Sequence, residues 1–257
     1  MTQEYSVPSV DRALAILELI ARSRRGYTMS DISRKLALPK SSIHLLVSTL
    51  EHKGYLQKNR LTGKHMFGTK LVSLSHAAFE KLGFRDEARP YLMKLMHRTG
   101  LTVHAAILDR TEAVIVDKME LPGMLRVATW VGRRLDLNCS GVGKTLLAYC
   151  SETETEVYFA GPPLARYNEN TIVSAVRLRQ DLKKARESGY VFEDEEGEIG
   201  FRCVGAPVFG DARSVIAAIS VAGTTAQIPH QGVPELAHML KSVAAEISAQ
   251  MGYSNVS

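Results

Sequence analysis

The sequence predicts a two-domain α+β protein: a small basic helical domain, then a linker helix, then a larger domain of strands and helices. The length of 257 residues leaves room for two modest domains. Residues 1–83 hold thirteen basic and six acidic residues, a net charge of +7, whereas the rest of the chain carries −2 of the total +5. Helical spacing of apolar residues dominates the basic part, whose alternating segments are limited to one short hairpin, and longer alternating segments follow it. The excess of positive charge favours a polyanionic partner for the first domain.

The composition is that of an ordinary globular protein, 45% hydrophobic and 23% charged. The sequence has three cysteines, Cys139, Cys150 and Cys203. A secreted protein held by disulfides would have more cysteines, and an even number of them. The longest stretch without Lys, Arg, Asp or Glu, residues 214–234, is too polar to cross a bilayer. Glu4 precedes any apolar run, unlike the order in a signal peptide. We therefore expect a cytoplasmic protein without a membrane partner.

The first element is a helix that starts at Ser9 and closes before Gly26. Ser9 is placed as its N-cap, and apolar residues follow at helical spacing, among them Val10, Leu14 and Ile20. Three arginines near its end suit the negative end of the helix dipole.

Two further helices joined by a tight turn predict a helix-turn-helix. Thr28 or Ser30 caps the short first helix, and Pro39 stands at the start of the second. The second helix carries an apolar stripe from Ile43 to Leu50, which leaves small and polar side chains on the opposite face. Such a face suits a DNA-reading helix. Together with Arg34 from the first helix, the candidate contacts are Lys40, Ser41, Ser42, His44, Leu45 and Ser48. For His44, partial packing in the core stays as open as contact with a base.

A basic hairpin follows, because residues 55–58 and 64–67 alternate as strands around the turn 59–63. A helix pair with a hairpin is typical of a winged helix, in which the second helix reads bases and the wing neutralises phosphates. The wing residues with that role are Lys58, Arg60 and Lys64. The combination with the local charge of +7 favours DNA binding over an ordinary solvated surface.

Residues 70–82 keep a helical apolar stripe that Gly83 ends, which predicts a linker helix between the domains and a dimer contact. Pro90 lies near the start of another amphipathic helix, closed by Gly100. Strands are expected at 103–108, 113–119, 204–208 and 215–221, and a last helix from Pro234 to about residue 251.

The segment Ser140 to Thr145 (SGVGKT) invites a phosphate-loop interpretation, which fails because the position that needs a glycine is Asn138. The favoured interpretation is that Gly141 and Gly143 open a helix over 144–150 and expose backbone N–H groups that can hold a small anion. A tight turn without a ligand is the alternative.

The acidic run at 193–196 (EDEE) lacks an ordered set of His or Cys partners, so by itself it predicts a solvated loop. Cys203 has Arg202 beside it but no identifiable histidine base, so a pocket wall or a buried thiol is preferred to a nucleophile. No catalytic residue, metal ligand or cofactor site is expected.

Several motifs occur in order along nearly the whole chain. They are SV at 9–10, RAL at 12–14, IL at 16–17, LPKSSIH at 38–44, GYL at 54–56, SGVGKTLLA at 140–148, GY at 189–190, EDEE at 193–196, GFRCVGAPV at 200–208 and AAISVAG at 217–223. Together they resemble the IclR family of bacterial transcriptional regulators. The resemblance implies a winged helix-turn-helix over residues 1–68, a linker helix over 69–84 and a GAF-like α/β effector-binding domain over 85–257.

The resemblance also implies an effector pocket, built from the residues Trp130, Gly141, Val142, Glu193, Phe201, Cys203, Ser220 and Ala222. Family members often have aspartate at 193, leucine at 201 and serine at 222, so this chain has a longer acid, a larger ring and one hydroxyl fewer. That difference favours a partly apolar or aromatic carboxylate over a very small keto acid. Family members also commonly carry arginine where this chain has Leu45, so we expect a different operator preference.

We therefore expect a regulator that binds a near-palindromic DNA operator as a dimer or dimer of dimers and responds to a small organic acid. The linker helix would couple the two events. Two alternatives stay open: a DNA-binding regulator whose second domain only oligomerises, and an enzyme that uses Cys203 or a carboxylate beside a basic accessory domain. Both repressors and activators occur in the family.

Overall fold

The computed structural model describes residues 6–23, 25–122, 127–211 and 214–253, except the side chains of 76 and 78–82. The chain divides into two compact units, Met1–Lys81 and Leu82–Ser257. The division falls inside one helix, α4 (Lys70–Leu82), at the place where the sequence predicts a linker helix. No helix among these residues has the length and apolar character needed to cross a membrane.

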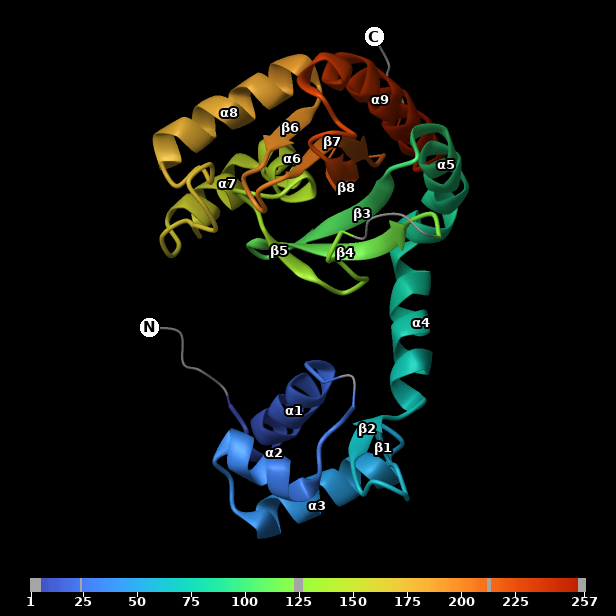
Figure 1. Cartoon of the computed structure of the whole chain (residues 1–257), viewed down its shortest axis with the longest axis vertical. Helices are drawn as coiled ribbons and strands as arrows, with labels where there is room; N and C mark the ends of the chain where they lie inside the picture. The colour runs from blue at the N-terminus through green and yellow to red at the C-terminus, as the bar shows by residue number, and fades with distance from the viewer. Residues whose placement is uncertain (1–5, 24, 123–126, 212–213, 254–257) are drawn as a thin grey trace. The chain divides into compact units, whose positions relative to one another are not determined.

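The first unit is built from three helices and a hairpin (Figure 1). Its elements are α1 (Pro8–Ala21), α2 (Met29–Leu36), α3 (Lys40–His52), β1 (Leu56–Lys58) and β2 (His65–Phe67), followed by all of α4 except its last residue. Its core contains Ile16, Ile20, Ile32, Ile43, Val47 and Leu56. This is the predicted winged helix-turn-helix.

The start of α1 corrects one expectation. Val7, and not Ser9, is the N-cap, because Pro8 takes the first helical position, where its missing N–H costs nothing. The N-cap therefore lies two residues earlier than expected, and Val10 and Leu14 lie on the exposed side of the helix.

The turn between α2 and α3 is held by local hydrogen bonds. Of the two expected caps, Thr28 is the one used: its hydroxyl accepts from the N–H of Asp31, whose carboxylate accepts in return from the N–H of Thr28. Ala37 ends α2 in the left-handed region at φ 53°, and the hydroxyl of Ser33 donates to the carbonyl of Leu38 at 2.6 Å. These contacts fix the direction in which α3 leaves the turn.

The second unit is built on a six-stranded antiparallel sheet with the order β5-β4-β3-β8-β7-β6. The strands are β3 (Thr102–Asp109), β4 (Glu112–Met119), β5 (Arg134–Asp136), β6 (Val191–Asp194), β7 (Phe201–Phe209) and β8 (Val215–Thr224). The expected strand pairs are present, and β5 and β6 extend the sheet at its two edges.

Helices cover both faces of this sheet (Figure 1). On one face α6 (Gly141–Tyr149) packs across β7, β8 and β3, and α8 (Ala175–Ser188) packs on α6. On the other face α5 (Phe84–Thr99) and α9 (Val233–Gln250) pack against each other. A short α7 (Glu152–Phe159) follows α6, and a 3-10 turn, η1 (His230–Gly232), precedes α9.

Two helix starts differ from the expectation. Pro90 lies inside α5, which begins at Phe84 because Gly83 turns the chain at φ 57° and Asp86 and Glu87 favour a helix amino end. Helix α6 begins at Gly141 and not at Lys144, because Ser140 already caps it.

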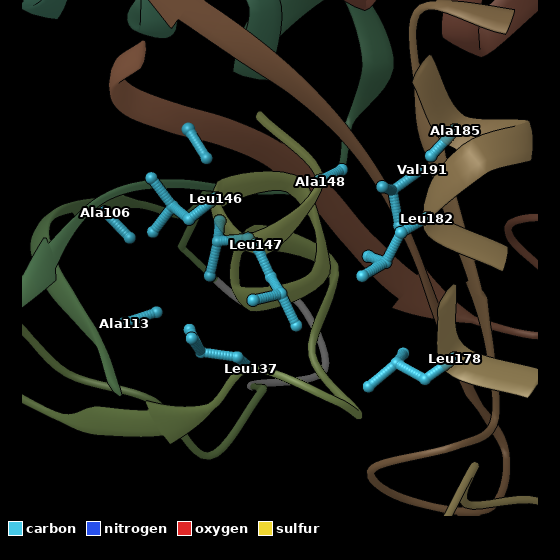
Figure 2. Packing of buried hydrophobic residues seen from close by; sticks show 12 residues of the cluster. Ala106, Ala113, Leu137, Leu146, Leu147, Ala148, Leu178, Leu182, Ala185 and Val191 are labelled. Atoms are coloured by element: carbon cyan, nitrogen blue, oxygen red, sulfur yellow. The ribbon is translucent and has the colours of Figure 1, made fainter. Parts of the chain in front are cut away.

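A leucine cluster fixes the position of α6. Figure 2 shows Leu146 and Leu147 of α6 between the alanines of the sheet and Leu178 and Leu182 of α8. All of these side chains are buried, so α6 packs against the sheet on one side and against α8 on the other. Its amino end is thereby held in one place over the sheet.

Candidate functional site

The first candidate site is the exposed face of α3. Lys40, Ser41, His44 and Leu45 are exposed, and Ser42 and Ser48 are half-buried, while Ile43 and Val47 fill the core beneath them. His44 does not pack in the core, so of its two interpretations only the exposed one fits the fold. The face presents small side chains, one lysine and Leu45, which is 69% exposed.

The wing adds the cations of the same unit. Its strands pair antiparallel, with Leu56 opposite Phe67 and Lys58 opposite His65. Lys58 and Arg60 are exposed and Lys64 is half-buried. All three lie on the hairpin that follows α3, as a phosphate-binding wing requires.

Arg34 on α2 is exposed and donates to Asp31 at 2.7 Å. The Thr28 hydroxyl and N–H, with Arg34 beside them, lower the pKa of Asp31, so its carboxylate is charged. Because an exposed ion pair of this kind is weak, Arg34 can exchange Asp31 for a phosphate.

His65 joins the wing to the helices. Its backbone pairs with Tyr27, and its ring is buried, with Nε2 3.7 Å from a carboxylate oxygen of Glu51 on α3. Burial lowers the pKa of His65, so the ring is neutral at pH 7. The wing is therefore anchored by a neutral residue in a basic unit.

The second candidate site is a cavity of about 150 Å³ in the second unit. Three parts of the chain enclose it: the amino end of α6, the sheet face beneath α6, and the segment around β5. The residues that line it are His104, Val127, Ala128, Thr129, Arg133, Arg134, Leu135, Asp136, Cys139, Ser140, Gly141, Val142, Tyr167, Glu193, Gly197, Glu198, Phe201, Cys203 and Ser220.

Strand register brings its polar groups together. Glu193 lies opposite Cys203, and Ser220 lies opposite both Gly205 and His104. Directly opposed residues share a face, and so do residues two apart along one strand. Glu193, Cys203, Ser220 and His104 therefore lie on the one face that α6 covers.

Two glycines let α6 approach this face closely. A Cβ on Gly141 would lie 2.7 Å from the Cβ of Cys203, and one on Gly205 would lie 2.7 Å from the carbonyl oxygen of Gly141. No larger residue fits at either position without a shift of the helix. The amino end of α6 is thus set directly on β7.

The amino end of α6 lies at the cavity, and its first N–H, that of Gly141, donates to the sulfur of Cys203. The Ser140 hydroxyl accepts from the N–H of Gly143 at 3.1 Å and donates to the carbonyl of Asp136 at 2.8 Å. The N–H groups of Gly141 and Val142 precede the first intrahelical acceptor, as in every α-helix. Both residues line the cavity, where the positive end of the helix dipole favours an anion.

Burial sets the protonation of the cavity walls. Burial, with the cations Lys118 and Arg133 nearby, lowers the pKa of His104 to about 3, so this histidine is neutral. Its Nε2 lies 2.8 Å from the hydroxyl of Thr129. Burial raises the pKa of Glu193 to about 7, although the N–H groups of Glu196 and Gly197 donate to it at 2.6 and 3.0 Å. Burial and the neighbouring Glu193 raise the pKa of the Cys203 thiol well above its usual value.

The two arginines of the cavity differ in their partners. Arg134 forms ion pairs with Asp109 and with Glu112, the latter at 2.9 Å. Arg133 lies over the ring of Trp130, 5.1 Å from its centre, and has no carboxylate within ion-pair distance in the described part of the chain. The charge of Arg133 is therefore available to an anion in the cavity.

The acidic run beside the cavity is not the solvated loop expected from the sequence. Glu196 binds the fully buried Lys144 at 2.7 Å, and Asp181 of α8 binds the same ammonium at 2.6 Å. Burial works against the charge of Lys144, but the two carboxylates outweigh it and raise the pKa of the amine. Lys144 therefore ties the loop to α6 and α8.

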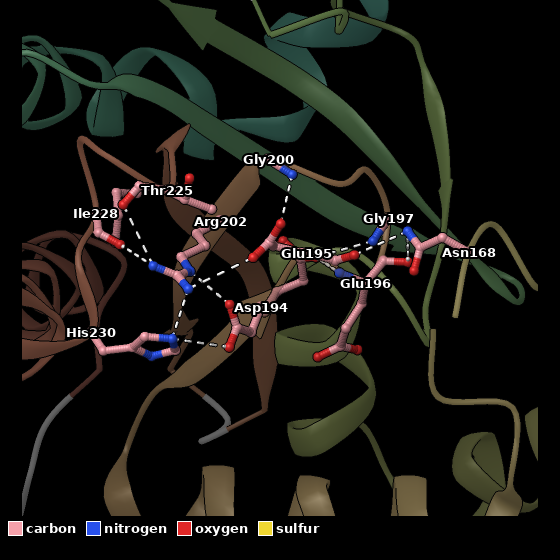
Figure 3. A network of polar contacts seen from close by, with 11 residues as sticks. Asn168, Asp194, Glu195, Glu196, Gly197, Gly200, Arg202, Thr225, Ile228 and His230 are labelled. Atoms are coloured by element: carbon pink, nitrogen blue, oxygen red, sulfur yellow. Dashed lines mark hydrogen bonds and ion pairs between the residues drawn. The ribbon is translucent and has the colours of Figure 1, made fainter. Parts of the chain in front are cut away.

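The other two acids of the run bind Arg202 (Figure 3). Arg202 donates to Asp194 at 2.6 Å and lies 3.7 Å from Glu195, and it also reaches the carbonyl of Ile228 and the ring of His230. Each acid of the run is thus tied to a neighbouring group, and among residues 6–23, 25–122, 127–211 and 214–253 no His, Cys, Asp and Glu cluster could hold a metal.

The structure brings together six of the eight residues assigned to the pocket. Gly141, Val142, Glu193, Phe201, Cys203 and Ser220 line the cavity. Trp130 lies outside it against Arg133, and Ala222 is buried opposite Cys203 without lining the cavity. Sequence reasoning missed His104, Thr129, Arg133 and Tyr167. His104 alone carried a signal, as a polar residue inside an apolar strand.

Comparisons with known proteins agree over both units. The family model described as Bacterial transcriptional regulator IclR C-terminal matches residues 76–249, and the one described as IclR helix-turn-helix domain matches residues 9–60. The HTH-type transcriptional regulator XynR of Escherichia coli (strain K12) is 34% identical over 249 residues, which is 96% of this chain and 98% of that protein.

Solved structures show the same fold. The crystal structure of the Thermotoga maritima IclR has a TM-score of 0.82 at 30% identity and covers 96% of this chain and 99% of its own. An IclR homolog from Microbacterium hydrocarbonoxydans, crystallised in complex with 4-hydroxybenzoate, has a TM-score of 0.85 at 25% identity. The match covers 96% of this chain and 100% of that one.

Proposed function

The chain belongs to the IclR family of bacterial transcriptional regulators and is a DNA-binding regulator; from this premise we propose how it works. It binds a palindromic operator as a dimer or a dimer of dimers, and a small carboxylate in the cavity of the second unit changes that binding. Because its partner is DNA, we place the protein in the cytoplasm.

The contacts of the proposed operator complex divide into two kinds. The exposed face of α3, with Lys40, Ser41, Ser42, His44, Leu45 and Ser48, reads bases in the major groove. Arg34 on α2 and the wing residues Lys58, Arg60 and Lys64 hold phosphates. Leu45 can contact a thymine methyl but cannot pair with guanine as an arginine does, so base preference at that position differs from that of relatives with arginine.

One observation carries the proposal for the ligand: Arg133, without a carboxylate partner in the described part of the chain, lines the same cavity as the first amides of α6. An anion is the ligand that satisfies both groups. The cavity of about 150 Å³ is well below the roughly 300 Å³ at which pockets for drug-sized ligands begin. Leu135, Val142 and Phe201 supply apolar wall, which suits a ring or an alkyl group beside the carboxylate.

The related Microbacterium protein supports this choice, since its structure holds 4-hydroxybenzoate, an aromatic carboxylate. We propose a ligand of that class for this chain. We also propose that the cavity binds and does not catalyse, because burial keeps the thiol of Cys203 protonated and a thiol is a poor nucleophile.

Coupling between the sites is proposed to run through α4. A ligand shifts an equilibrium only if it binds one geometry of the dimer more tightly than another. DNA selects among those geometries through the spacing of half-sites, about 34 Å for each helical turn. Helix α4 spans the boundary between the two units along the chain and is the segment that can transmit such a change.

A thermal-shift panel of acids tests the ligand proposal on the intact chain. We expect benzoate-sized aromatic carboxylates to raise the unfolding temperature of the second unit, by about 5–10 °C at a hundredfold excess over Kd. The corresponding amides should not act, and Arg133→Gln should lose the shift. Arg110→Gln, on the β3–β4 turn outside the cavity, is the matched control and should keep it.

Two outcomes contradict parts of the proposal. Stabilisation by two- and three-carbon keto acids alone would contradict the aromatic class. A chain that no acid stabilises, and that carries no small molecule detectable by mass spectrometry after purification, would be a regulator whose second unit only oligomerises.

A further inference from the structure

The wing of the first unit ends in a leucine that lies almost entirely in water. Leu61 is 97% exposed, and Leu45 on α3 follows at 69%, so these two are the most exposed large hydrophobic side chains of the described residues. A single exposed apolar residue is ordinary on a protein surface. Here, however, both extremes fall on the elements that meet DNA, the wing and the recognition helix.

Hydrogen bonds order the backbone of the wing tip around Leu61. The side-chain oxygen of Asn59 accepts from the N–H groups of Leu61 and Thr62, each at 3.0 Å. The backbone of Asn59 also donates to the carbonyl of Lys64 and accepts from Gly63, both at 2.8 Å. A tip that is already ordered loses little conformational freedom when it binds.

The surroundings of Leu61 are cationic. Lys58, Arg60 and Lys64 flank it, and residues 52–69 contain no acidic residue at all. An apolar side chain among cations of the same hairpin matches a nucleic-acid groove, whose rims carry phosphates and whose floor is formed by base edges. A purely apolar protein surface would give these cations no partner.

We propose that Leu61 enters the minor groove and wedges into a base step, while the three cations hold the phosphates on either side. Leucine is one of the side chains that partly unstack a step in this way and kink the duplex. Steps of pyrimidine followed by purine yield most easily, so they should lie under the wing. The inference requires only that the chain binds DNA and is independent of operator symmetry and of the ligand.

The test uses the intact chain and a duplex that it selects from a random-sequence library. Copies of this duplex carry 2-aminopurine at successive steps beneath the wing, because its fluorescence rises when a base unstacks. Leu61→Ala should weaken binding about tenfold and abolish the fluorescence rise. The slope of log K against log salt should stay unchanged, since no phosphate contact is lost.

Two further variants separate a wedge from a general loss of structure. Leu61→Met keeps a long apolar side chain and should keep most of the affinity and the fluorescence rise. Val176→Ala, on α8 of the second unit, is the matched surface control: this valine is 67% exposed, and its loss should change neither quantity. All variants should unfold at the temperature of the unchanged chain, because both side chains lie in water.

Three results would each overturn the proposal. One is Leu61→Ala binding within twofold of the unchanged chain while Arg60→Ala weakens binding. Another is a duplex that shows no fluorescence rise with the unchanged chain at any step. The third is that replacing thymine by uracil, which removes the major-groove methyls, abolishes the difference between Leu61→Ala and the unchanged chain.

Discussion

At the scale of single residues, Glu193 is a buried acid whose charge changes near neutral pH. Burial raises its pKa to about 7, so at that pH about half of the molecules carry a neutral carboxyl in the cavity. A protonated Glu193 can donate a hydrogen bond to a carboxylate ligand, whereas the ionised form repels it. The proposed ligand should therefore bind better in mild acid.

We predict that the affinity for an aromatic carboxylate falls about tenfold between pH 6 and pH 8, since the protonated fraction falls by that factor around a pKa of about 7. Glu193→Gln keeps an oxygen that can accept from Glu196 and Gly197 and should bind with little pH dependence. Isothermal titration calorimetry at four pH values measures this. Glu198→Gln, an exposed acid at the same cavity, should keep the dependence of the unchanged chain.

The same shift affects stability in a known direction. The folded chain binds the proton of Glu193 more tightly than the unfolded chain does. The contribution of this proton to the free energy of unfolding is therefore fully present below the usual pKa of 4.5. It is lost as the pH rises through about 7. A free energy of unfolding that rises between pH 5 and 7 in the unchanged chain relative to Glu193→Gln would contradict this assignment.

Among the residues of the cavity, sequence reasoning found those that belong to motifs and missed those that the fold brings in. Glu193, Cys203 and Ser220 stand in recognisable segments, and strand register places them on one face. Arg133 and Tyr167 lie in irregular segments without periodicity, and only tertiary packing brings them to the same cavity. No local pattern in the sequence distinguishes Arg133 from Arg134. Only the fold shows that Arg134 has carboxylate partners, Asp109 on β3 and Glu112 on β4.

At the scale of elements, the contact between α6 and β7 depends on two glycines. A methyl group on Gly205 would lie 2.7 Å from the carbonyl oxygen of Gly141 and would also collide with Thr145. Neither group can move freely, because α6 is held by the leucine cluster on its other side. The amino end of α6 would have to lift from the sheet.

We therefore predict that Gly205→Ala destabilises the second unit by about 1–3 kcal/mol, the usual cost of overpacking, and weakens ligand binding. Urea unfolding measures the first effect and calorimetry the second. Gly232→Ala is the control, since its added methyl group would come no closer than 3.7 Å to Pro229 and should change neither quantity. Equal stability of Gly205→Ala and the unchanged chain would show that α6 can shift at no cost.

Element boundaries were predictable where a single residue marks the end, and less so where an earlier residue can start the helix. Thr28, Gly83 and Gly100 mark helix ends in the sequence, and the structure has ends there. The expected starts at Ser9, Pro90 and Lys144 were wrong. In each case an earlier residue already satisfied the amino end: Pro8 in α1, the acids of the first turn in α5 and Ser140 in α6.

At the scale of the whole molecule, the positive charge of the first unit should appear in the salt dependence of DNA binding. Each phosphate contact that a lysine or arginine makes contributes about −0.9 to the slope of log K against log salt on duplex DNA. Removing two such residues in each protomer therefore changes the slope in proportion to the number of protomers on the duplex.

We predict that the double variant Lys58→Ala, Arg60→Ala lowers the magnitude of this slope by about 3.6 if two protomers bind, against about 1.8 for one. Filter binding at five salt concentrations measures it. Lys183→Ala removes an exposed lysine of the second unit and should leave the slope unchanged. A double variant with the slope of the unchanged chain would mean that the wing does not touch phosphates.

The predicted two-domain architecture was confirmed, with a helix-turn-helix unit followed by an α/β unit. Two sequence features indicated the division into two domains. The apolar spacing changes because the first unit buries helix faces and the second buries strand faces. The charge is uneven because only the first unit binds DNA. The second unit's edge strands β5 and β6 were not predicted, since three or four residues are too few to show a period.

The raised pKa of the Cys203 thiol, a half-buried group that lines the cavity, has a consequence under oxidative stress. Peroxides attack thiolates, and a thiol that stays protonated reacts slowly. The walls that raise its pKa therefore also protect the sulfur from conversion to a sulfenic acid. Treatment with hydrogen peroxide should therefore leave Cys203 unmodified and the binding of the proposed carboxylate unchanged.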